Sequence, residues 1–313
     1  MLKRIKYFAI FIAVCILLPF CVVSFISKLF SKETIQKPTE VQGNIAVSES
    51  KSIPVLMPNG ETAHIDTEEY VLRVVLAEMP TNFEEEAIKA QAVLARTYAL
   101  KHKQSMTKHG VGAVCTSSDC CQAFYNKDIP EDESIQKALS AVNATKGMVL
   151  TYLNELIEAT YFSCSGGLTE NASDVWGEVV PYLVSTESKG EEDSEHYIST
   201  ITMSEQEFFV KLGLNENDIE ILNPVYTDGG GVAEIQICEK LFTGMQVRKL
   251  LNLKSTAFHI SAVGDNVIIT TKGYGHRVGM SQYGANAMAR DGHTYDEILT
   301  YYFPCTRLEK EMY

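Results

Sequence analysis

An uncharged run of 20 residues, Tyr7–Ile26, constrains this chain more than any other feature of its sequence. A helix of that length spans the hydrocarbon core of a bilayer. Three basic residues (Lys3, Arg4 and Lys6) precede the run and no small-residue cleavage site follows it, which disfavours a cleaved signal peptide. We therefore predict that residues 1–32 form one N-terminal transmembrane anchor, with the amino end in the cytoplasm and the remaining chain outside.

The part of the chain beyond the anchor is acidic. The 313 residues carry 27 Lys and Arg against 40 Asp and Glu, and five of the basic residues lie within the anchor segment. Binding to nucleic acid requires a basic surface, so the charge excludes this class of function. The hydrophobic share of 45% is typical of a globular protein with a proper core.

A polar linker at 33–52 leads to a folded domain at 53–313, of which about 186–260 is expected to form a smaller inserted α/β subdomain. Helix and strand signals follow one another without regular alternation, which favours an α+β fold over a doubly wound sheet. The elements that the pattern predicts are strands at Ile53–Met57, Thr62–Ile65, 147–152 and Val267–Thr271, helices at Glu68–Glu78, 82–101, Ser134–Val142 and Gln246–Leu251, a hairpin turn at 228–231, and capping boxes at Ser204 and Thr294.

Glu78 is the first candidate for chemistry. It follows Val71, Val74 and Val75 at helical spacing, so its carboxyl group lies on the apolar face of a helix that Pro80 ends. Loss of water and the negative end of the helix dipole both raise the pKa of such a carboxyl group, as a general acid near neutral pH requires. The alternative is a terminal glutamate that bends into solvent, as most glutamates are exposed.

His109, Cys115, Cys120 and Cys121 form the second candidate site. One imidazole and two thiolates are a ligand set suited to zinc. The spacing does not match a CxxC knuckle, so a Cys115–Cys121 disulfide or free buried thiols remain as alternatives. Adjacent side chains point in different directions, so we expect only one of Cys120 and Cys121 to join the site.

The third candidate is the glycine-rich segment Gly273–Gly284. Its glycines allow close approach to a ligand, and its polar and aromatic side chains, His276, Ser281, Gln282 and Tyr283, suit a sugar. The alternative is a tight structural turn in which Ser281 only caps the next helix. A similar run, Ser163–Glu170, contains no Gly-x-Ser-x-Gly elbow, so its serines are interpreted as ligand contacts or structural groups.

Six short strings together resemble the stage II sporulation protein D family, in unbroken order over about residues 53–308. The strings are Ala77-Glu-Met-Pro80, the helical segment Glu86–Tyr98, Cys121-Gln122, Ser165-Gly-Gly167 with Thr169-Glu170, Pro181-Tyr-Leu183, and Gly279-Met-Ser-Gln-Tyr-Gly-Ala285. One position departs from the pattern, because similar proteins usually have glycine in place of Arg277. Members of this family are membrane-anchored enzymes of endospore-forming bacteria.

The resemblance implies a lytic transglycosylase that cleaves peptidoglycan between N-acetylmuramic acid and N-acetylglucosamine during engulfment, leaving a 1,6-anhydromuramic end. The family's catalytic glutamate falls on Glu78, and its metal residues fall on His109, Cys115 and Cys121, with zinc in a structural role. Gln122, Ser165 and Tyr182 lie in the matched strings and are added to the four loop residues as expected sugar contacts.

The resemblance also implies partners and a location. The expected substrate is a glycan strand from which an amidase, stage II sporulation protein P, has removed the stem peptides, and the expected membrane scaffold is stage II sporulation protein M. The domain is expected outside the cell membrane, facing the septal wall. The alternative function is a non-catalytic wall-binding protein that enhances a partner amidase. A zinc peptidase or zinc amidase is disfavoured because no HExxH motif occurs.

Overall fold

In a computed structural model of the chain, residues 51–313 are described, apart from 107, 110–111, 131, 216–219 and 312–313. The predicted anchor Tyr7–Ile26 and nearly all of the linker lie outside the described residues. Among the helices that are described, none is both long and apolar enough to cross a bilayer. The fold is a mixture of helices and small sheets, which confirms the predicted α+β class.

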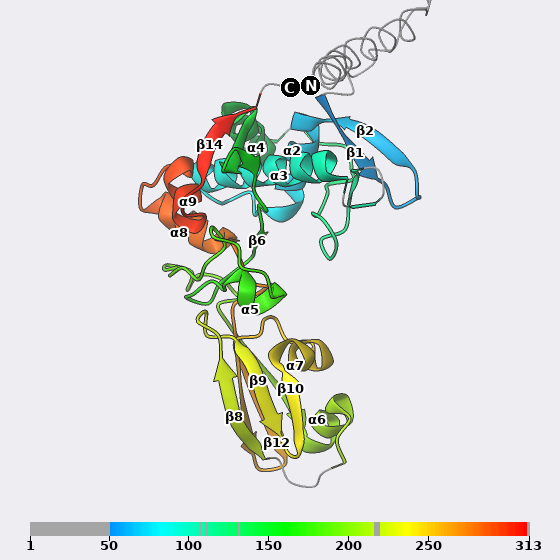
Figure 1. The fold of residues 1–313 in the computed structure, drawn as a ribbon, viewed down its shortest axis with the longest axis vertical. Helices are drawn as coiled ribbons and strands as arrows, with labels where there is room; N and C mark the ends of the chain where they lie inside the picture. Colours follow the sequence, from blue (N-terminus) through cyan, green and yellow to red (C-terminus); the bar gives the residue numbers. More distant parts are fainter. Residues whose placement is uncertain (1–50, 107, 110–111, 131, 216–219, 312–313) are drawn as a thin grey trace, which may run out of the picture. The chain divides into compact units, whose positions relative to one another are not determined.

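The first hydrophobic core surrounds the long helix α3 (Glu85–Ser105), which contacts α2 (Thr67–Glu78), α4 (Glu133–Ala144), α8 (Gln282–Arg290) and α9 (Tyr295–Tyr302) (Figure 1). Small side chains let neighbouring helices approach closely. Five alanines of α3 are fully buried in these contacts: Ala87, Ala90, Ala92, Ala95 and Ala99. The high alanine content noted in the sequence therefore reflects packing on several sides of one helix.

Small sheets border this core and bring distant segments together. In one sheet, β1 (Ser52–Leu56) pairs antiparallel with β2 (Thr62–Asp66) and parallel with β3 (Val114–Cys115). In another, β6 (Tyr161–Phe162) pairs parallel with β13 (Met280–Ser281), which places the glycine-rich segment beside Ser163. A third sheet has the order β14 (Arg307–Lys310), β4 (Met148–Tyr152), β5 (Glu155–Leu156).

A separate hydrophobic cluster runs from Met203 to Ile269 and forms a second core. Its two antiparallel sheets have the orders β11-β12-β7 and β10-β9-β8. Figure 1 shows β8, β9 and β10 side by side in the second of them. Its elements are β7 (Ile198–Ser204), α6 (Glu205–Leu212), β8 (Ile221–Tyr226), β9 (Val232–Ile237), β10 (Lys240–Thr243), α7 (Gly244–Leu251), β11 (Phe258–Val263) and β12 (Asn266–Lys272). The short helix α5 (Ala172–Trp176) precedes this cluster in the sequence, and its Ala172 belongs to the first core.

Local signals explain where several elements begin and end. The backbone of Met79 is extended (φ −112°, ψ 133°), so α2 ends directly before Pro80 as predicted. Thr243 and Gln246 form a capping box, and α7 therefore begins two residues before the predicted start. The capping box of Thr294 and Glu297 opens α9, also as predicted.

Candidate active site

An open cleft of about 900 Å³ contains most of the candidate chemistry. Glu78 at the end of α2, Gln122, Cys120 and Cys121 line this cleft. Aromatic and basic side chains from β6, α5, α7 and the glycine-rich segment line it as well. They are Tyr161, Phe162, Trp176, Arg248, Tyr274 and His276.

Glu78 is half-buried, and the valines on the same face of α2 are part of the first core. The backbone N–H of Ala123 donates to Glu78 Oε1 over 2.6 Å. Burial raises the pKa of Glu78, and the hydrogen bonds from Ala123 and from the Tyr161 hydroxyl only partly oppose this effect. The carboxyl group is therefore held in a fixed place, beside a cleft, in an environment that favours its protonated form.

A buried hydrogen-bond network positions this carboxyl group. The Tyr70 hydroxyl donates to Gln122 Oε1 over 2.9 Å, and Gln122 Nε2 donates to the Tyr161 hydroxyl over 2.9 Å. Because both ends of its amide are used in this way, Gln122 acts as a support in the wall, in place of the predicted sugar contact. Its neighbour Ala123 supplies the N–H that contacts Glu78, so the chain from Gln122 to Ala123 fixes the acid.

The cysteine loop ends directly before Gln122, and its side chains converge. One ligand atom from each of His109, Cys115, Cys120 and Cys121 lies within 4.8 Å of all the others. The expectation that only one of Cys120 and Cys121 joins the site is therefore wrong. The backbone N–H groups of Cys120 and Cys121 both donate to the carbonyl oxygen of Ser117, over 3.1 and 2.8 Å. This turn brings the two thiols into the same cluster.

The cluster fits a four-coordinate metal. His109 Nε2 lies 3.6 Å from Cys120 Sγ and 3.5 Å from Cys121 Sγ, and the two sulfur atoms are 3.9 Å apart. Tetrahedral zinc with its usual bond lengths separates two sulfur ligands by about 3.8 Å and a sulfur from a nitrogen ligand by about 3.6 Å. Cys115, Cys120 and Cys121 are free thiols in the structure, so the alternative Cys115–Cys121 disulfide is not formed.

His276 lines the same cleft, among aromatic side chains. Its ring is 5.7 Å from that of Phe162 and 5.4 Å from that of Trp176, which is 45% exposed. Its Nδ1 accepts a hydrogen bond from the N–H of Val278 over 3.1 Å. Burial, together with the nearby charge of Arg248, lowers the pKa of His276 to about 4. This part of the cleft therefore offers a neutral imidazole and aromatic faces, which suit an uncharged sugar ring.

Comparison with known proteins identifies the family. The family model described as Stage II sporulation protein matches residues 59–152. Stage II sporulation protein D of Bacillus subtilis (strain 168) is 37% identical over 276 residues, which cover 83% of this chain and 80% of that relative. This chain belongs to the stage II sporulation protein D family.

Two further relatives agree with this assignment. Stage II sporulation protein D of Bacillus amyloliquefaciens is 37% identical over 269 residues, covering 81% of this chain and 78% of the relative. The amidase enhancer of Bacillus subtilis (strain 168) is 29% identical over 294 residues, covering 75% of this chain but 39% of that longer protein. The family resemblance seen in the six strings is thus confirmed.

Arg277, where similar proteins usually have glycine, makes contacts that glycine could not make. The backbone of Arg277 has φ +65°, a conformation that favours glycine. Its buried guanidinium donates to Glu170 Oε1 over 3.1 Å and to the carbonyl oxygens of Ser165, Leu168 and Gly229. The side chain thereby joins the glycine-rich segment to the hairpin turn between β8 and β9.

Four of the predicted sugar contacts lie away from the cleft. Ser165 and Ser281 are fully buried and make internal hydrogen bonds, to Glu191 and as the cap of α8 respectively. The Tyr182 hydroxyl accepts from the N–H of Glu158, and the Tyr283 ring packs edge-on against Phe83. The structure therefore corrects these four to structural roles, because Ser165, Ser281 and Tyr182 use their hydroxyl groups inside the fold and Tyr283 packs its ring there. His276 and Gln282 do line the cleft.

Glu191 supports this site, although no motif in the sequence points to this residue. Its Oε2 accepts from the N–H groups of Ser165 and Gly166 and from the side chains of Cys164 and Ser165, at 2.8 to 3.1 Å. Its Oε1 accepts from the Ser188 hydroxyl over 2.5 Å. This buried carboxylate fixes the segment that β6 leads into, next to Phe162 and the cleft.

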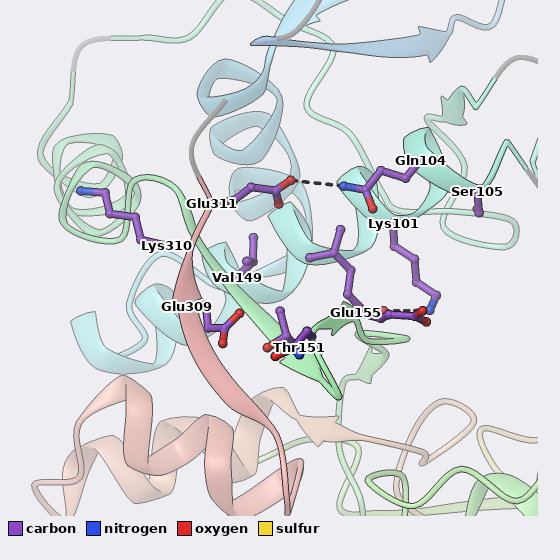
Figure 2. Close-up of a pocket in the computed structure, with 11 residues that line it drawn as sticks. Lys101, Gln104, Ser105, Val149, Thr151, Glu155, Glu309, Lys310 and Glu311 are labelled. Atoms are coloured by element: carbon purple, nitrogen blue, oxygen red, sulfur yellow. Dashed lines mark hydrogen bonds between the residues drawn. The ribbon is translucent and has the colours of Figure 1, made fainter. Parts of the chain in front are cut away.

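A second cleft, of about 490 Å³, lies between the end of α3 and the sheet of β4, β5 and β14 (Figure 2). Two of its polar side chains make hydrogen bonds within it. Lys101 Nζ donates to the carbonyl of Leu156, and Gln104 Nε2 donates to Glu311 Oε1. The cleft contains no member of the His/Cys cluster and none of the predicted site residues. The cleft beside Glu78 is therefore the candidate active site of this family member.

Proposed function

We propose that this protein is a lytic transglycosylase, which cleaves peptidoglycan glycan strands between N-acetylmuramic acid and N-acetylglucosamine. The observation that carries the proposal is Glu78, a half-buried carboxyl group with a raised pKa on the wall of an open cleft. The other acidic side chains of the cleft are less suited to act as a general acid. Glu178 and Asp119 are exposed. The pKa of Glu158 is lowered, because the effect of its burial is outweighed by pairing with His102 and Lys101.

One carboxyl group is sufficient for this reaction. Hydrolytic glycosidases use two, because one protonates the leaving oxygen and the other acts as nucleophile or activates water. In a lytic transglycosylase the C6 hydroxyl of the muramic sugar attacks its own C1. Glu78 donates its proton to the glycosidic oxygen, the C1–O bond breaks, and the carboxylate then takes the C6 hydroxyl proton as the anhydro ring closes. Intramolecular attack gains from proximity, so no water needs to be positioned.

A digestion experiment tests this function. Full-length protein in detergent is incubated with peptide-free glycan strands, and the fragments are analysed by mass spectrometry. We expect fragments that end in 1,6-anhydromuramic acid, 18 Da lighter than the hydrolysed equivalents, since ring closure retains no water. Intact strands, together with stimulation of an added wall amidase, would instead support the amidase-enhancer alternative, which the similarity to the Bacillus subtilis amidase enhancer favours.

The second part of the proposal is a structural zinc ion held by His109, Cys115, Cys120 and Cys121. Such a four-ligand set leaves no open position and serves to cross-link a loop. The loop continues directly into Gln122 and Ala123, so zinc would hold the N–H that contacts Glu78. Its contribution to catalysis is therefore the position of the acid.

Zinc content and stability can be measured together. We expect one zinc per purified chain, and both Cys120→Ser and Cys121→Ser should lower the zinc content and lower the Tm by about 5 °C or more, as each removes a ligand. Cys305→Ser changes an exposed thiol outside the cluster and is the matched control. Full zinc content and an unchanged Tm in Cys120→Ser would show that the fourth ligand is another group.

We further propose that Tyr7–Ile26 anchors the protein in the cell membrane, with the folded domain outside. There the domain would meet peptidoglycan and the amidase stage II sporulation protein P, and stage II sporulation protein M would act as a membrane scaffold. A protease added to intact protoplasts should then remove the whole folded domain. Protection of the domain, or its release as a shorter soluble protein, would contradict a single uncleaved anchor.

A further inference from the structure

Arg248 lies where two clefts adjoin, and the proposed mechanism gives this residue no role. It belongs to α7 in the second core, and its side chain lines both the large cleft and an adjoining one of about 420 Å³. His276 lines the same two clefts. The guanidinium is half-buried, so it is partly removed from water at the place where a ligand in the cleft would pass.

The charge of Arg248 has no counter-charge within the described part of the chain. Its Nε donates to the carbonyl of Leu253 over 3.4 Å, and its two terminal nitrogens make no hydrogen bond or ion pair with any described residue. The other described arginines that are buried or half-buried behave differently, because each pairs with a carboxylate. These pairs are Arg73–Glu69, Arg96–Glu68 and Arg277–Glu170.

The surroundings hold the guanidinium in place for a ligand. The carbonyl of Leu253 fixes one edge of the guanidinium, and the N–H of Gly275 donates to the carbonyl of the next residue, Lys254, over 3.1 Å. The Lys254 ammonium in turn lies 4.5 Å from the centre of the Tyr274 ring. The turn after α7 is thus attached to the glycine-rich segment, and the free edge of the Arg248 fork can receive a planar anion such as a carboxylate.

A glycan strand offers one such anion. The hydroxyl and acetamido groups of both sugars are neutral, whereas muramic acid also carries a lactyl group. Its carboxylate is free when no stem peptide is attached, and it is a neutral amide when a peptide is present. We propose that Arg248 binds the free lactyl carboxylate of a muramic residue and thereby selects strands without stem peptides. This inference rests on the proposed function, because it assumes a glycan strand in the cleft.

Binding measurements test this proposal without relying on cleavage. Full-length Glu78→Gln protein is titrated calorimetrically with short peptide-free glycan fragments, and with the same fragments after conversion of their lactyl carboxylates to methylamides. We expect the carboxylate form to bind at least tenfold more tightly, because an arginine–carboxylate pair is lost in the amide. Adding Arg248→Gln should remove this preference by weakening only the carboxylate form.

Controls separate charge recognition from damage to the fold. Lys249→Gln removes a charge from an exposed neighbour on the same helix and should keep the full preference. Arg248→Lys keeps the charge without the planar fork and should give an intermediate preference, and unchanged thermal unfolding shows that each variant is folded.

Three results would overturn the assignment of Arg248. The first is that Arg248→Gln weakens binding of the carboxylate and methylamide fragments equally. The second is that Arg248→Gln keeps the preference for the carboxylate fragments, and the third is that peptide-bearing fragments bind more tightly than peptide-free ones. The outcome is independent of the proposed reaction. Loss of the preference in Arg248→Gln supports the assignment even if the wild-type protein releases no anhydro-ended product.

Discussion

Replacing Glu78 by glutamine is expected to abolish the release of anhydro-ended fragments from peptide-free strands. Glutamine keeps the shape of the side chain and can still accept the N–H of Ala123, but it has no proton to give to the glycosidic oxygen. A positioned general acid and base contributes about 10²–10⁴-fold to a rate, so the loss should approach the detection limit of mass spectrometry. Unfolding and fragment binding should remain close to those of the wild-type protein.

The matched control is Glu178→Gln, which changes an exposed acid on the wall of the same cleft. It should retain activity within a few-fold of the wild-type value, because its carboxyl group is not desolvated and is not held by the network around Gln122. Substantial anhydro-product formation by Glu78→Gln would mean that another carboxyl group donates the proton. The acid assignment would then be wrong, although the fold and the zinc site would be unaffected.

The part of this site that the sequence predicts is the part that depends on local spacing. The position of Glu78 on the apolar face of α2 follows from three valines at helical spacing, and the end of the helix follows from Pro80. The convergence of His109 with the cysteines is likewise contained within one short loop. In such cases neighbouring residues in the sequence decide the geometry.

Contacts between distant segments could not be predicted in this way. Glu191 begins an acidic run with Glu192 and Asp193, and no local signal shows that the first of the three is buried under Ser165 while the other two are exposed. The uncompensated charge of Arg248 is also a property of the surroundings that α7 meets in the fold.

The polar residues of the glycine-rich segments illustrate a general ambiguity. Ser165 and Ser281 have the composition expected of sugar contacts, yet both are buried and serve as hydrogen-bond partners of the fold. Buried loops contain backbone groups that no regular element satisfies, and small polar side chains are one source of their partners. A serine in a buried glycine-rich loop can therefore be structural for the same reason that it looks functional.

The second large effect is expected on stability, at the buried pair of Arg277 and Glu170. Arg277→Met removes the guanidinium and leaves the Glu170 carboxyl group buried without its counter-charge. Breaking a buried pair from one side typically costs about 3–5 kcal/mol. Arg277→Gly suits the local φ of +65° and resembles the usual residue of similar proteins, but it leaves the same carboxyl group uncompensated and should also destabilise the protein.

A double-mutant cycle separates the pair from its surroundings. Burial raises the pKa of Glu170 and lowers that of Arg277, so each charge is tolerated mainly because of the other. Glu170→Gln keeps an oxygen for the N–H of Gly231 and removes the charge, and we expect the double variant with Arg277→Met to be less destabilised than the sum of the single variants. The measurement is the free energy of unfolding of the full-length chain in denaturant, with the zinc content recorded in parallel. Additive effects would show that the two charges do not stabilise one another. A loss of zinc in Arg277→Met would mean that the damage extends from the glycine-rich segment to the His/Cys cluster.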